Sequence, residues 1–186
     1  YKFTGENKGR KETQMFLGKA VLIAIGLIII VMVAQFNSIA LPLIVITSVF
    51  MSVMGVLLGL IVHDRPFGII MTGVGTVALA GIVVNNAIVM LDFVVKLRKR
   101  GFGRNEAMIL ASAVRFRPVL LTAITTIIGL APIAMGMDID FSRDSPVVFG
   151  SASASFWKAM ALAIMYGLGV ATFLTLFMVP TLYSLI

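Results

Sequence analysis

The chain has 186 residues, of which 60% are hydrophobic and 12% are charged. A soluble domain carries about twice that share of charged residues, so the composition indicates a membrane protein. The absence of cysteine and the single histidine, His63, exclude disulfides, thiolate metal sites and histidine metal clusters. The net charge of +7 comes from basic residues in short stretches between apolar runs, which favours membrane topology and lipid contact over nucleic-acid binding.

The first residues of the chain differ from the rest in composition. Residues 1–14 are polar, and the chain starts at Tyr1 without the charged, apolar and small-residue segments of a signal peptide. We therefore expect residues 1–14 to be the end of a preceding domain, and the chain to be part of a larger polypeptide. Residues 15–186 are expected to form a transmembrane domain.

Five stretches are long and apolar enough to cross a bilayer, which takes about 20 mostly apolar residues. They are residues 16–36, 39–62, 67–95, 118–137 and 159–186. Pro118 opens the fourth stretch, where its missing N–H costs little, and Pro180 predicts a kink near the end of the fifth. The sequence thus predicts an all-α membrane protein with five transmembrane helices.

A basic loop orients these spans. Residues 96–117 carry one acid, Glu106, against seven bases: Lys96, Arg98, Lys99, Arg100, Arg104, Arg115 and Arg117. Because short loops rich in lysine and arginine stay in the cytoplasm, the third span is expected to run inward and the fourth outward. Residues 1–14 and 138–156 then lie on the outer side. The bases of the N-terminal tail are discounted, since the rule does not score a large translocated domain.

The basic loop contains one helical pattern of its own. Residues 105–114 predict a short helix whose apolar side holds Met108, Ile109 and Leu110. Arginines flank this segment, as in helices that lie along a membrane surface. A solvated linker helix is the equally weighted alternative.

Small residues recur at helical spacing on the second and fifth spans. The two faces consist of Ser48, Ser52, Gly55 and Gly59, and of Ala159, Ala163, Gly167 and Ala171. Such faces let helix backbones approach closely in lipid, so we expect Gly55, Gly59 and Gly167 to be helix-packing residues. Gly81 of the third span is a further packing candidate.

Two spans carry polar stripes inside otherwise apolar sequence. On the third span, Gly81, Asn85 and Asp92 share one helical face, and Asn86 follows Asn85 directly. On the fourth span, one face holds Thr122, Thr125, Thr126 and Gly129. Polar residues at membrane depth are costly, so these stripes predict a hydrogen-bonded seam inside the bundle.

Each polar group also has a purely structural interpretation. The threonines can bond the carbonyls of their own helix, and Asn85 and Asn86 can simply join helices at about 1 kcal/mol per bond. Asp92 is either a cytoplasmic gate for protons or, as we favour, an interfacial anchor whose charge reaches water. From spacing alone, transport and helix association remain equally weighted.

The stretch Gly81–Val89, with its paired asparagines, resembles the tenth helix of resistance-nodulation-division (RND) efflux permeases. Further similar pieces occur in the expected order along the chain. They are Phe3–Asn7, Gln35–Ser38 with Pro42, Arg115–Thr122 and Val179–Tyr183. The resemblance covers essentially the whole chain.

This resemblance implies that the chain holds the last five of twelve helices, with residues 1–14 as the end of a periplasmic domain. It also implies a multi-pass protein of the bacterial inner membrane, within a proton-driven homotrimer that exports drugs or other amphiphiles. The implied partners are the N-terminal half of the permease, a periplasmic adaptor (membrane-fusion) protein and an outer-membrane channel.

The resemblance also assigns roles to particular residues. Many multidrug members place a lysine on the tenth helix and a threonine on the eleventh to support proton-binding acids of the fourth helix. Thr122 matches the threonine, whereas Asn85 stands at the lysine position and cannot exchange a proton. We expect Asn85, Asn86 and Thr122 to orient a carboxylate that lies outside this chain.

Two other functions are compatible with the residues. One is a relative within the RND superfamily that moves lipids or assists protein export, and the other is a membrane scaffold that transports nothing. An enzyme is not expected, because no titratable pair is placed for acid–base work and no activated nucleophile is evident. We expect no cofactor and no metal.

Overall fold

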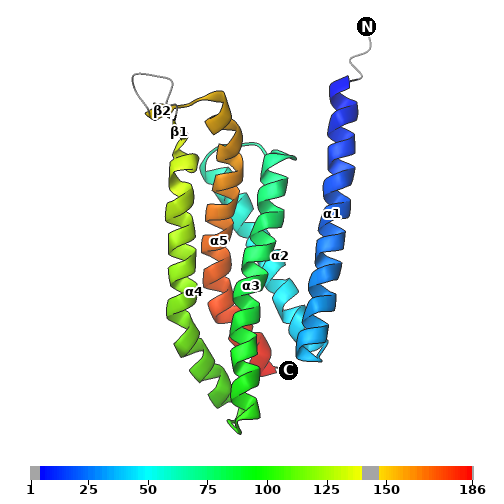
Figure 1. The fold of residues 1–186 in the computed structure, drawn as a ribbon, viewed down its shortest axis with the longest axis vertical. Coiled ribbons are helices and arrows are strands. Elements are labelled where there is room, and N and C mark those ends of the chain that lie inside the picture. The colour runs from blue at the N-terminus through cyan, green and yellow to red at the C-terminus, as the bar shows by residue number, and fades with distance from the viewer. Residues whose placement is uncertain (1–4, 140–146, 186) are drawn as a thin grey trace.

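The structure, a computed structural model, describes residues 5–139 and 147–185. Within them the chain forms five long helices and one two-stranded sheet (Figure 1). The helices are α1 (Gly5–Phe36), α2 (Ala40–Val62), α3 (Met71–Lys99), α4 (Arg104–Met135) and α5 (Ala152–Leu185). Each contains a stretch long and apolar enough to cross a membrane. The expected all-α membrane fold is confirmed.

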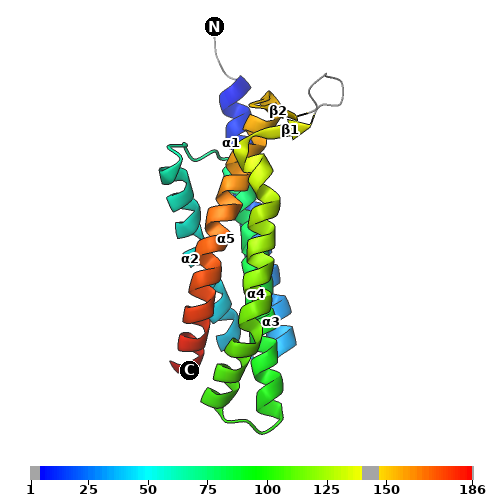
Figure 2. The same ribbon diagram turned by 90° about the vertical axis from the view of Figure 1, so that its left-hand side faces the viewer.

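Helix α5 is the centre of the bundle, and α1 is its periphery. Half of the apolar window of α5 is buried, against 6% of that of α1. Helix α5 packs against α2, α3 and α4, whereas α1 packs mainly against α2 and α3 (Figures 1 and 2). Consequently α1 exposes large apolar side chains such as Leu22 and Ile30, which suit a lipid environment.

Four helices, α1, α3, α4 and α5, extend beyond one end of the predicted span. Helix α3 continues to Lys99 and α4 begins at Arg104, so residues 100–103 alone connect them in place of the predicted loop 96–117. Residues 105–114 form the start of α4 rather than a separate helix. Pro118 lies inside α4, where it removes the bond to the carbonyl of Val114. Figure 1 shows the first turns of α4 inclined to the remainder, as expected for a proline kink.

A small hairpin that the sequence did not predict joins α4 to α5. Strands β1 (Met137–Ile139) and β2 (Val147–Phe149) pair antiparallel, with Asp138 opposite Val148. Gly136 ends α4 in the left-handed conformation, at φ 78°, which a glycine adopts without strain. The rest of the expected outer loop, residues 140–146, lies outside the described residues, as do residues 1–4.

Helix α5 begins at Ala152, ahead of the predicted residue 159, because Ser151 caps it. The Ser151 hydroxyl accepts a hydrogen bond of 2.9 Å from the Ala154 N–H and donates one of 2.7 Å to the Asp138 carboxylate. A capping serine satisfies an N–H that would otherwise lack a partner. Residues 152–158, which include Ser153, Ser155 and Lys158, can therefore be helical although they are not apolar enough to be predicted as a span.

Candidate functional site

The predicted polar stripe of α3 lies on the outer surface of the bundle. Asn85 and Gly81 are exposed, and Asn86 is half-buried. The opposite face of α3 is buried and apolar, with Leu79, Val83, Met90 and Val94 at most 1% exposed. Among the described residues, neither asparagine side chain has a hydrogen-bond partner. Their amides are therefore free to bond groups outside this bundle.

The threonine stripe of α4 is also turned outward. Thr122 and Thr125 are exposed, together with Gly129 on the same face. Each hydroxyl donates to a carbonyl of its own helix: Thr122 to Val119 at 2.9 Å, Thr125 to Leu121 at 2.8 Å, and Thr126 to Thr122 at 2.7 Å. These bonds satisfy the hydroxyl protons, but they leave each hydroxyl oxygen able to accept a further bond.

The two stripes border the contact between α3 and α4. Val83 of α3 and Ala123 of α4 belong to one buried cluster. Because side chains follow one another at about 100° around a helix, Asn86 and Thr122 lie at the edges of this contact and Asn85 lies farther out. No hydrogen bond joins these three residues within the described parts of the chain. The predicted seam is thus an open polar strip beside the α3–α4 contact, not a closed network.

Arg115 is a candidate residue to which the sequence analysis, which counted it as a loop charge and as the start of a family-like segment, assigned no functional role. Its guanidinium lies 4.9 Å from the ring centroid of Phe93 on α3. Its Nε is buried and has no hydrogen-bond partner among the described residues. Arg115, Thr122 and Gly129 stand seven residues apart, so they share a helical face. That spacing was a sequence signal that Arg115 belongs with the threonine stripe.

Asp92 lies near the end of α3, where it forms an ion pair. Its Oδ2 is 2.7 Å from Nζ of Lys96, one turn further along the helix. The two side chains are 33% and 65% exposed. Such an exposed pair on one helix contributes about 0.3–0.5 kcal/mol. This geometry suits the interfacial anchor that we favoured, although it does not test the gate.

Three of the four glycines predicted to mediate packing lie between α2 and α5. A Cβ on Gly55 would be 2.7 Å from Cβ of Val170, and one on Gly59 would be 2.6 Å from Cβ of Tyr166. A Cβ on Gly167 would overlap Leu79 and Val56. Gly81 differs, because nothing lies within 4 Å of the position its Cβ would occupy. It is an open position beside Asn85.

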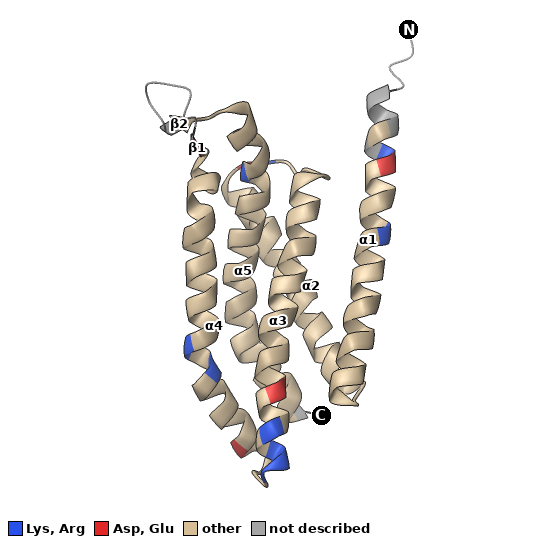
Figure 3. Cartoon of the chain, in the orientation of Figure 1, with Lys and Arg blue, Asp and Glu red and all other residues tan. Residues whose placement is uncertain are grey.

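Basic residues collect at one end of the bundle. Figure 3 shows them at the last turns of α3 and the first turns of α4, with further charges at the start of α1 at the other end. Lys96, Arg98, Lys99 and Arg100 are all exposed there. The end of α5 and the start of α2 lie at the same end of the bundle (Figure 1).

The chain is similar to known proteins over its whole length. The model of the AcrB/AcrD/AcrF family matches residues 1–186. The swarming motility protein SwrC of Bacillus subtilis is 34% identical over 170 residues, covering 91% of this chain and 15% of SwrC. The multidrug resistance protein MdtC of Erwinia tasmaniensis is 31% identical over 182 residues, covering 97% of this chain and 16% of MdtC.

A metal-resistance relative and a solved structure show the same relationship. The cobalt-zinc-cadmium resistance protein CzcA of Cupriavidus metallidurans is 31% identical over 165 residues, covering 89% of this chain and 14% of CzcA. The crystal structure of a heavy metal efflux pump superposes with a TM-score of 0.78 at 25% identity, covering 96% of this chain and 16% of the pump. The chain therefore spans about 14–16% of the length of these proteins.

Proposed function

The chain belongs to the AcrB/AcrD/AcrF family of RND permeases, and on that premise we propose that it is the C-terminal membrane part of a proton-driven efflux transporter. The observation that carries this proposal is the open polar strip of Asn85, Asn86 and Thr122. In a bundle that is otherwise apolar, unpartnered amides imply that a further membrane segment covers them, because polar groups exposed to lipid are costly.

The covering segment is proposed to carry the carboxylate that binds the coupling proton. Asparagine and threonine side chains can donate or accept hydrogen bonds, but they do not titrate in the working pH range. Arg115 supplies a cation on this face. Its Nε is buried and has no hydrogen-bond partner among the described residues. Amides, a hydroxyl and a guanidinium would together orient a carboxylate and respond to its protonation.

The proposed location is the bacterial inner membrane, with the basic end of the bundle in the cytoplasm. The accumulated lysines and arginines at that end support this orientation. The proposed assembly is a homotrimer with a periplasmic adaptor and an outer-membrane channel, as the family resemblance implies. We do not expect the chain to be an enzyme.

The proposed substrates are drugs or other amphiphiles, which the similarity to a multidrug resistance protein supports. Metal-ion export is the competing specificity, because CzcA and the heavy metal efflux pump are similarly related. Proteoliposomes that contain the complete permease and an imposed pH gradient would distinguish the two. Ethidium accumulation without zinc transport is the expected result, and zinc transport without ethidium transport would contradict it.

The role of the polar strip is tested in the same proteoliposomes. Replacing both asparagines, Asn85→Ala with Asn86→Ala, is expected to reduce proton-coupled transport by about tenfold or more, since a hydrogen bond to a charged group contributes about 1.5–3 kcal/mol. Val89→Ala is the matched control, because Val89 is an exposed residue on the same helix with no polar group. Wild-type transport by the double variant would refute the assignment.

A further inference from the structure

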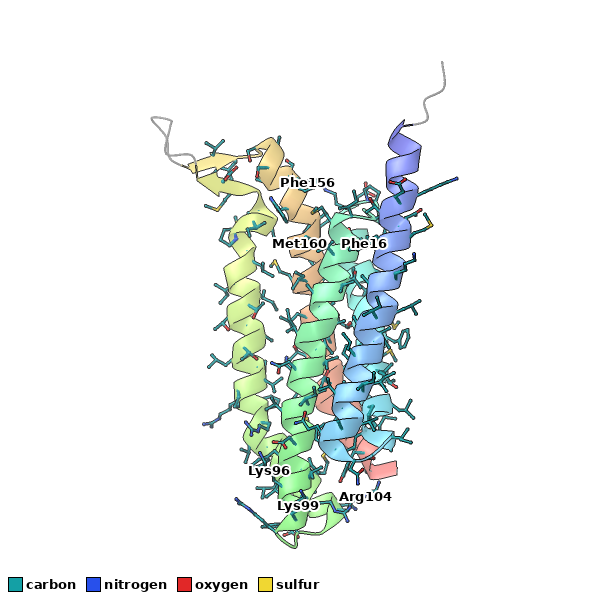
Figure 4. All side chains as sticks on the ribbon, turned by 45° about the vertical axis from the view of Figure 1, so that its right-hand side comes forward. Phe16, Lys96, Lys99, Arg104, Phe156 and Met160 are labelled. Carbon is teal, nitrogen blue, oxygen red and sulfur yellow. The ribbon has the colours of Figure 1, made fainter. Side chains whose placement is uncertain are left out.

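A cavity of about 230 Å³ lies at the basic end of the bundle, where four helices meet. Its lining includes Arg98 near the end of α3, Arg104 at the start of α4 and Tyr183 near the end of α5. Ser38, in the turn before α2, and Ala40, Leu41 and Ile44, in the first turns of α2, line the remaining side. Figure 4 shows Arg104 at the same end of the bundle as Lys96 and Lys99.

The cavity is cationic. Arg104 donates a hydrogen bond from Nη2 to the carbonyl oxygen of Tyr183, and its guanidinium lies 5.4 Å from the centroid of the Tyr183 ring. These contacts hold the guanidinium in place while leaving several of its five N–H donors unused. Arg98 has no side-chain partner among the described residues, and no carboxylate contributes to the lining. Two permanent positive charges therefore share one cavity without a counter-ion from these helices.

The start of α2 adds further donors. Ile39, the N-cap residue, provides no side-chain hydrogen bond to the first turn. The N–H groups of a first turn lack partners within their own helix, so they favour an anion. In α2 these donors are the N–H groups of Ala40 and Leu41, since Pro42 has none. The Ser38 hydroxyl is a further donor on the same wall.

The other wall of the cavity is apolar and leads into the membrane-facing surface. Leu41 and Ile44 line it, and both are largely buried. Ile39 and Leu43, on the neighbouring outer face of α2, are 73% and 60% exposed. A molecule held in the cavity by a charged group could thus lay an acyl chain along α2. A free inorganic ion would use only the polar wall.

We propose that this cavity binds a phosphate group, and that its carrier is a phospholipid of the adjoining leaflet. Guanidinium groups pair with phosphate oxygens through two parallel hydrogen bonds, which a planar fork favours. The cationic and apolar walls together match the headgroup and the first part of the chain of an anionic lipid. This site lies at the end of the bundle, apart from the polar strip, and does not depend on the proposed proton coupling.

The test is lipid retention by the complete permease in detergent, measured by native mass spectrometry with added phosphatidylglycerol. The variant Arg98→Gln is informative because Arg98 forms no hydrogen bond or ion pair with the described residues that its replacement would break. Combined with Arg104→Gln, it is expected to weaken phosphatidylglycerol binding by about a hundredfold, because each guanidinium loses its hydrogen bonds to a charged phosphate. Arg98→Gln alone is expected to cause about a tenfold loss, which exceeds the roughly fivefold loss expected for removing any basic residue near an anionic surface.

Arg100→Gln is the matched control, because Arg100 is exposed at the same end but does not line the cavity. If Arg100→Gln weakened phosphatidylglycerol binding as much as Arg98→Gln does, general attraction to the basic surface would explain both losses and the proposal of a specific site would be wrong. Unchanged binding in Arg98→Gln would overturn it as well. A parallel titration with inorganic phosphate shows whether the site takes a lipid or a free ion. Binding of inorganic phosphate without any retention of phosphatidylglycerol would overturn the lipid assignment.

Discussion

Replacement of Gly55 by alanine tests whether close approach of α2 and α5 stabilises the bundle. The new Cβ would lie 2.7 Å from Cβ of Val170, 2.9 Å from the carbonyl oxygen of Tyr166 and 3.0 Å from Cα of Gly167. Two of these atoms belong to the backbone, so no side-chain rotation relieves the overlap. Ordinary contact begins at about 3.4 Å, and the helices must therefore separate by about 0.7 Å along the most crowded direction.

The expected cost follows from two opposing terms. Overpacking of a well-packed contact costs about 1–3 kcal/mol. Alanine is favoured over glycine within a helix by about 1 kcal/mol, which offsets part of that cost. Gly26→Ala on α1 is the matched control, because nothing lies within 4 Å of its Cβ position. Both variants gain the same helix propensity, so the difference between their free energies of unfolding contains only the overpacking cost of about 1–3 kcal/mol.

The assay is thermal unfolding of the complete permease in one detergent, with both variants measured beside the wild type. Gly55→Ala is expected to lower the midpoint temperature, and Gly26→Ala is expected to leave it unchanged or raise it slightly. Equal shifts in the two variants would refute the reasoning, because they would mean that α2 and α5 are not held at the distance described.

Substitutions at two further residues test individual charges. Arg115→Gln is expected to reduce proton-coupled transport about tenfold, because the buried Nε of Arg115 has no hydrogen-bond partner among the described residues and is proposed to bond an acceptor outside this chain. Arg115→Lys should restore little of this transport, since lysine lacks the planar guanidinium group. Normal transport in both variants would show that Arg115 does not act with the polar strip. Asp92→Asn is expected to leave the pH profile of transport unchanged and to cost about 0.5 kcal/mol or less, because it breaks only an exposed pair with Lys96. A displaced pH profile in proteoliposomes would instead favour the gate.

The local sequence pattern was sufficient to predict the transmembrane spans but not the residues at which the helices begin and end. Apolar runs predicted all five helices because a bilayer demands about 20 such residues. The start of α5 was missed because a serine cap extends the helix beyond the apolar run. The start of α4 was missed because basic residues were assumed to form a loop, whereas arginine is a good helix former and Gly103 provides the start.

The candidate site was predictable in part. The spacing of Asn85 and Thr122 placed each on a polar face, and the structure puts both faces outward beside the α3–α4 contact. The role of Gly81 in packing was predicted from its small size, yet no described atom approaches it closely. A stripe of small residues identifies a possible contact face, but only the neighbouring helices determine whether that face is filled.

The sequence by itself determined the class of protein, the number of spans, the small-residue faces and the two polar stripes, because these depend on composition and helical period. The tertiary structure alone decided which helix is central, which faces remain open, and that Arg98, Arg104 and Ser38 surround one cavity. These residues come from α3, α4 and the turn before α2. Their proximity depends on how separate helices pack, which periodicity within a single helix does not specify.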